Sequence, residues 1–145
     1  MKKKLVSFVL ATSMAIALCA CGSSDAPAPA PEEPKKPADL TGEWKQTNSK
    51  SEDSWQAANI TADTIEVYWV TDGGETSALY WAGTYVAPTT ADEPYSWESI
   101  NDKEKTGMAL LASGDDTKKF TYEKGEISYS VSALGTTTTV KLGKN

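Results

Sequence analysis

Short segments of alternating apolar and polar residues, each bounded by turn residues, constrain the fold of this chain most strongly. Ile127, Tyr129 and Val131 alternate with serines in one such segment. Phe120 and Tyr122 alternate with polar residues in another. This period of two is typical of strands with one buried face, and turn signals about every 8–12 residues are typical of a sandwich or barrel. The pattern predicts an all-β domain.

The predicted strands follow one another with short links over residues 40–145, which we assign to one domain. Their expected ranges are 42–47, 54–61, 64–70, 78–87, 95–101, 107–112, 118–123, 126–133 and 136–142. The least regular region is 95–111, where residues 100–105 also fit a turn or a short helix. About eight or nine antiparallel strands predict a small up-and-down barrel or a two-sheet sandwich.

The first twenty residues have the layout of a secretory signal peptide. Three lysines follow Met1, residues 5–18 are largely apolar, and small residues with a cysteine close the stretch. A membrane-spanning helix needs about 20 apolar residues, and this run is shorter and has no cluster of lysines after it. We therefore predict a signal peptide over residues 1–20 rather than a retained transmembrane helix.

The residues Leu18-Cys19-Ala20-Cys21 resemble the lipobox of bacterial lipoproteins. The resemblance implies that Cys21 receives a diacylglycerol and becomes the first residue of the mature protein. Two or more acyl chains hold a protein stably at a membrane. We therefore expect an extracytoplasmic protein that is lipid-anchored to the cell membrane, on its outer face in a Gram-positive cell. Gly22 after Cys21 favours export to the outer membrane in a cell that has two.

Residues 21–39 are predicted to form a disordered linker after the lipid-bearing cysteine. Proline recurs from Pro27 to Pro37 among alanine, glutamate and lysine. Proline removes backbone donors and disfavours a packed core, so the segment should be extended. At about 3.1 Å per residue it spans roughly 55 Å, enough to hold a domain away from a membrane. A PxxP recognition motif is the alternative to this spacer.

The predicted domain has two short resemblances to known barrels. Gly42-Glu43-Trp44 resembles the Gly-x-Trp that opens the first strand of lipocalins and avidin-like barrels, and Gly83-Thr84-Tyr85 resembles an avidin-like strand. These resemblances imply a barrel. The domain as a whole is similar to short uncharacterised lipoproteins of Gram-positive bacteria, which implies no activity.

The residue inventory excludes several kinds of chemistry. The chain has no histidine and no arginine, and neither Cys19 nor Cys21 would be a free thiol after processing. Histidine-based catalysis, cysteine nucleophiles and imidazole or thiolate metal sites are thus excluded, and we expect no cofactor. Carboxylates remain for glycoside hydrolysis, with Glu66, Glu98 and Glu123 as candidates or as solvent-facing residues. Acidic pairs in loops match turns better than calcium sites.

Tryptophan is abundant and suggests either a core or a ligand platform. Five tryptophans are present, and a small domain without disulfides needs such side chains in its core. Trp55 and Trp97 have polar neighbours and are expected to be the most exposed. Together with Tyr80 or Tyr95 they form the predicted ligand-contacting aromatic rim.

The net negative charge of the chain limits the classes of partner that it can bind. The net charge of −6 becomes more negative once Lys2, Lys3 and Lys4 leave with the signal peptide. An acidic surface disfavours nucleic acid and direct contact with anionic lipid headgroups. We expect membrane attachment through lipid and a non-catalytic module that binds a small ligand, glycan or protein. A carboxylate-based hydrolase of envelope or extracellular glycans is the alternative.

Overall fold

The computed structural model describes residues 33–145, and the fold is that of the compact unit Pro34–Asn145. The predicted signal peptide, the predicted lipid attachment at Cys21 and most of the predicted linker lie outside the described residues. The strands are β1 (Gly42–Gln46), β2 (Trp55–Ile60), β3 (Thr64–Thr71), β4 (Thr76–Thr84), β5 (Tyr95–Ile100), β6 (Thr117–Glu123), β7 (Glu126–Ala133) and β8 (Thr136–Lys144). The helices are the 3₁₀ turn η1 (Asp72–Gly74) and α1 (Lys103–Thr106).

A membrane-crossing helix is not found within residues 33–145, where no helix has the length and apolar character required.

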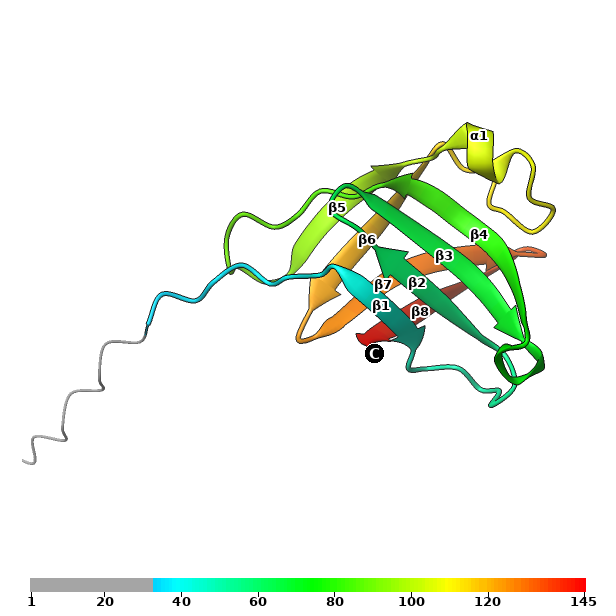
Figure 1. The fold of residues 1–145 in the computed structure, drawn as a ribbon, viewed down its shortest axis with the longest axis horizontal. Helices are drawn as coiled ribbons and strands as arrows, with labels where there is room; N and C mark the ends of the chain where they lie inside the picture. Colours follow the sequence, from blue (N-terminus) through cyan, green and yellow to red (C-terminus); the bar gives the residue numbers. More distant parts are fainter. Residues whose placement is uncertain (1–32) are drawn as a thin grey trace, which may run out of the picture. The chain divides into compact units, whose positions relative to one another are not determined.

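The strands form one antiparallel sheet in the order β4-β3-β2-β1-β8-β7-β6-β5 (Figure 1). Each strand pairs with its neighbours in sequence, except that β8 pairs with β1 and β4 only touches β5. The two edges meet at a bridge between Gly83 and Asn101, and the backbone N–H of Ile100 donates to Thr84 Oγ1 at 2.9 Å. The all-β prediction is confirmed, and the architecture is a nearly closed up-and-down barrel rather than a sandwich.

The barrel interior is filled by apolar and aromatic side chains. The largest fully buried ones include Trp81, Phe120, Ile65, Ile127 and Leu142. Each lies on the inward face of its strand, as the period-two alternation predicts. The core therefore comes from packing alone, since no cysteine is present after Cys21.

One end of the barrel, here called the closed end, is covered by the segment that precedes β1. Leu40 is almost completely buried, and its carbonyl accepts a hydrogen bond of 2.8 Å from Trp44 Nε1. Lys144 Nζ donates to the carbonyl of Asp39 at 2.8 Å, which ties the last strand to the same segment. The N-terminal segment therefore joins the barrel at this end, seen in cyan in Figure 1.

The predicted strand at residues 107–112 is wrong. Helix α1 precedes this stretch, with Asp102 as its N-cap, and the stretch itself consists of turns and loop. The long connection between β5 and β6 lies along β4 instead, because Asp102 N–H donates to the Ala82 carbonyl and Ser113 N–H to that of Tyr80, each at 2.8 Å. Residues 107–112 have no strand to pair with, and the short helix considered for 100–105 is α1.

Candidate binding site at the open end of the barrel

The end opposite Leu40, here called the open end, contains a hollow of about 590 Å³. It lies between the ends of β3 and β7, the middle of β4 and the loop before β6. Its lining residues are Trp69, Thr71, Tyr80, residues 111–115 and residues 131–133.

A β-bulge in β4 supplies the aromatic wall of this hollow. Val67 pairs with Trp81 and Tyr68 with Leu79, so Tyr80 is the extra residue. A bulge turns two successive side chains to similar directions, and both Tyr80 and Trp81 are buried. The ring of Tyr80 meets that of Trp69 edge-on, with centroids 5.5 Å apart. The hollow therefore has an aromatic pair on one side.

Lys118 is a buried cation next to the hollow. Its side chain is only 6% exposed, and Nζ lies 5.3 Å from the ring centre of Tyr80 and 5.2 Å from that of Trp81. Lys118 Nζ donates to Asp115 Oδ2 at 3.0 Å and more weakly to the Ser130 carbonyl at 3.4 Å. Because burial of an ammonium is costly without a partner, these acceptors hold Lys118 in place.

Asp115 is the exposed member of this ion pair and lines the hollow. Its side chain is 62% exposed. The Ser113 hydroxyl, which donates to Oδ2 at 2.7 Å, and then Lys118 hold the pKa of Asp115 below its usual range. Asp115 is therefore an anion at neutral pH.

A buried polar pair, Gln56 in β2 and Tyr129 in β7, lies deeper in the barrel than the hollow. Gln56 is completely buried, pairs across the sheet with Trp69, and accepts a hydrogen bond from the Tyr129 hydroxyl. Burial raises the pKa of Tyr129 well above its ordinary value, so its phenol stays neutral. Gln56 Nε2 has no hydrogen-bond partner within the described part of the chain. The core under the open end thus contains a buried polar pair, Gln56 and Tyr129.

Apolar side chains are exposed on two loops of the open end. Met108, Leu110 and Leu111 follow α1, and Leu134 lies at the tip of the β7–β8 hairpin. Leu110 and Leu134 are fully exposed. The hairpin turn has positive φ at both Leu134 and Gly135, a geometry typical of tight two-residue turns. Of these residues, Leu111 lines the hollow and offers apolar surface to a ligand there.

The four aromatic residues of the predicted rim are not brought together. Trp97 is buried, and its ring stacks on Phe120 with centroids 5.2 Å apart and on Tyr95 at 5.9 Å. The expectation that Trp97 is exposed was wrong, because its polar neighbours lie on the outer face while Trp97 itself faces inward. Of the four, Tyr80 lines the open end.

Trp55 is on the outer face of β2. It borders a groove of about 480 Å³ together with Tyr68. Lys45 Nζ sits 3.9 Å above the centre of the Trp55 ring. One face of this ring is therefore already in use as a cation–π partner, which leaves less of it for a ligand.

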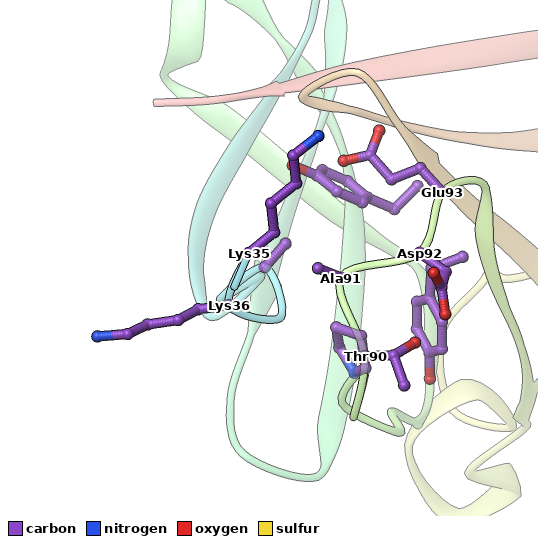
Figure 2. Close-up of a pocket in the computed structure, with 10 residues that line it drawn as sticks. Lys35, Lys36, Thr90, Ala91, Asp92 and Glu93 are labelled. Carbon is purple, nitrogen blue, oxygen red and sulfur yellow. The ribbon is translucent and has the colours of Figure 1, made fainter. Parts of the chain in front are cut away.

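Tyr95 lies at the closed end. It lines a hollow of about 360 Å³ between the segment before β1 and the loop before β5, and its hydroxyl donates to the Val86 carbonyl at 2.7 Å. Figure 2 shows the Lys36 side chain extending away from this hollow, with residues 90–93 on the facing loop. This hollow is smaller than the one at the open end and lacks a tryptophan.

The residues that matter most at the open end were missed in the sequence. Neither Trp69 nor Lys118 is among the residues that the sequence analysis expected to contact a ligand. The sequence did contain an indication, because Lys118 is two residues before the inward-facing Phe120 in β6 and the side chains of residues i and i+2 lie on the same face of a strand. That spacing places a lysine inside the barrel.

The carboxylates proposed for hydrolysis do not form a pair suited to it. Glu66 accepts hydrogen bonds of 2.6 Å from both Lys105 Nζ and the Tyr68 hydroxyl on the outer face. These bonds, Lys105 first, lower the pKa of Glu66, which makes it a poor proton donor near neutral pH. Glu98 and Glu123 are exposed. Within residues 33–145 no group of three or more acidic side chains is arranged to hold a metal ion.

No protein-family model matches the chain, and no curated protein or solved structure is significantly similar to it. A function for the barrel has therefore to be inferred from its own residues.

Proposed function

We propose that this protein is a lipoprotein of the cell envelope, anchored through Cys21, whose barrel is a non-catalytic binding module for a small ligand. The ligand contacts the hollow at the open end. The observation that carries this proposal is the aromatic wall of Trp69 and Tyr80 beside a volume of about 590 Å³. Small-molecule sites typically measure about 300–1,000 Å³ and combine an apolar lining with few polar groups.

The filled interior limits where a ligand can go. Trp81 and Phe120 occupy the middle of the barrel and are completely buried. The ligand therefore lies at the mouth, against Tyr80 and the exposed Leu111, rather than deep inside.

The position of the N-terminal segment suits an anchored binding module. The segment from Pro34 enters at the closed end, where Leu40 is buried. A stalk attached there leaves the open end on the opposite side of the barrel from its attachment.

The test is the binding of the fluorescent dye 1-anilinonaphthalene-8-sulfonate to the full chain carrying Cys21→Ala. We expect saturable binding that weakens severalfold in Trp69→Ala, because its ring lines the hollow. We also expect weakening in Ala133→Trp, which narrows the hollow without removing a core side chain. Trp55→Ala is the matched control on the outer face and should bind as before. Equal binding by all four proteins would contradict the proposed site.

A further inference from the structure

We propose that the open end selects ligands that carry an anionic group, and that this group takes the place of Asp115 as the partner of Lys118. This inference rests on the proposed function and names the chemical class of its ligand: an apolar or aromatic body with a carboxylate, sulfonate or phosphate at one end.

The first reason is the incomplete pairing of a buried cation. The Lys118 ammonium has three N–H donors, and the residues described supply two acceptors, Asp115 Oδ2 at 3.0 Å and the Ser130 carbonyl at 3.4 Å. The longer bond is weak, so Lys118 depends chiefly on Asp115. An anion that takes the place of Asp115 supplies Lys118 with an equally strong, charge-assisted partner.

The second reason is that the two partners differ in how firmly they are held. Lys118 lies within β6 opposite Ser99, and its side chain is 6% exposed. Asp115 belongs to the loop before β6 and its side chain is 62% exposed. An exposed carboxylate regains hydration when it is displaced, whereas a buried ammonium cannot. Exchange of the anion is therefore less costly than movement of the cation.

The third reason is the positive charge of Lys103 next to the loop that carries Asp115. Lys103 Nζ donates to the carbonyls of Gly114 at 3.0 Å and Asp115 at 3.2 Å, and it pairs with Asp116 Oδ1 at 3.0 Å. A second ammonium therefore lies against the loop that carries Asp115. The apolar body of the ligand meets Trp69, Tyr80 and Leu111 on the lining of the same hollow.

The test compares two dyes with one skeleton, 1-anilinonaphthalene-8-sulfonate and N-phenyl-1-naphthylamine, which lacks the sulfonate. Both are titrated by fluorescence into the full chain carrying Cys21→Ala. We expect Lys118→Met to weaken sulfonate binding about tenfold, the effect of losing a hydrogen bond to a charged group. The neutral dye should bind Lys118→Met as before. Asp115→Asn should strengthen sulfonate binding severalfold, because Lys118 then lacks its competing carboxylate.

The control is Lys45→Met, which removes an ammonium on the outer face and should change neither dye. The proposal is overturned if Lys118→Met and Asp115→Asn leave the ratio of the two affinities unchanged while both dyes bind; the binding site would then stand without its charge selectivity. If neither dye binds the parent protein, the proposed function fails as well. If Lys118→Met does not fold, Asp115→Asn decides, and unchanged sulfonate affinity in that variant overturns the proposal.

Discussion

Gly83 lies where β4 and β5 come closest, at the seam that closes the barrel. A Cβ atom at this position would be 2.5 Å from the Ile100 carbonyl oxygen and 2.5 Å from Ser99 Oγ. Ser99 is also fixed, because its hydroxyl accepts a hydrogen bond of 2.9 Å from Trp81 Nε1. The seam therefore tolerates no side chain at residue 83.

Gly83→Ala should lower the free energy of unfolding by about 1–3 kcal/mol, the usual cost of forcing extra atoms into a packed site. This change in the free energy of unfolding is measured by denaturant unfolding monitored by tryptophan fluorescence. Gly114→Ala is the control, since a Cβ there meets no atom within 4 Å. Equal stability of the two variants would show that the edges of β4 and β5 are further apart than described.

Tyrosines whose pKa values are raised in the folded state make the stability of the barrel depend on pH in the alkaline range. Burial raises the pKa of Tyr68 to about 12, helped by the hydrogen bond to Glu66, and burial also raises the pKa of Tyr85 to about 12. A tyrosine whose pKa is raised on folding makes its full contribution to the free energy of unfolding below its ordinary pKa of 10.0. This contribution is lost as the pH rises from 10.0 towards the pKa of the tyrosine in the folded state. Stability should therefore fall above pH 10.

The measurement is phenolate absorbance together with circular dichroism during an alkaline titration. We expect part of the tyrosine absorbance to appear only together with loss of structure. Full ionisation of all tyrosines near their ordinary pKa, in a barrel that remains folded, would contradict the raised pKa values of Tyr68, Tyr85 and Tyr129. Tyr68→Phe is the control: it removes one of these phenols, so less of the tyrosine absorbance should appear together with the loss of structure.

At the scale of elements, strands were predicted well wherever their alternation is regular. The predicted range 126–133 is β7 itself, and 64–70 falls short of β3 by one residue. The two errors have a common cause. Trp97 was expected to be exposed because its neighbours are polar, but its side chain faces inward. A strand was expected at residues 107–112 because they are apolar, but they have no partner strand, since their loop lies against β4. Orientation and pairing depend on neighbours that the local sequence does not specify.

Trp44 is the one buried residue of strand β1. Trp44 is buried, meets Tyr122 edge-on with ring centroids 6.4 Å apart, and holds Leu40 through its indole N–H. Trp44→Ala should lower the free energy of unfolding by about 3–5 kcal/mol. Trp55→Ala, on the outer face of β2, should cost less. Thermal and denaturant unfolding compare the two, and equal costs would argue that Trp44 is not part of the core.

At the scale of the whole molecule, the folded unit begins at Pro34 and its core at Leu40. We therefore expect a lipid on Cys21 to affect where the protein resides and to leave the stability of the barrel unchanged.

Cys21→Ala should move the protein from the membrane fraction to the medium or the periplasm, with the same melting temperature. Cell fractionation and circular dichroism measure the two properties, and mass spectrometry of the N-terminus detects the lipid in the parent protein. Retention of the variant in the membrane fraction would argue against the anchor. Ser23→Ala is a matched control two residues away and should stay with the membrane.

The sequence by itself determined the class of fold, the number of strands to within one, and the chemistry that is excluded. Alternation and turn residues are local properties, so they can be recognised without knowledge of the partner strands. Only the tertiary structure decided between barrel and sandwich, brought Lys118 beside Tyr80, and separated Trp55 from Trp97. These outcomes depend on register and on the bulge at Tyr80, which are set by contacts between residues far apart in the chain.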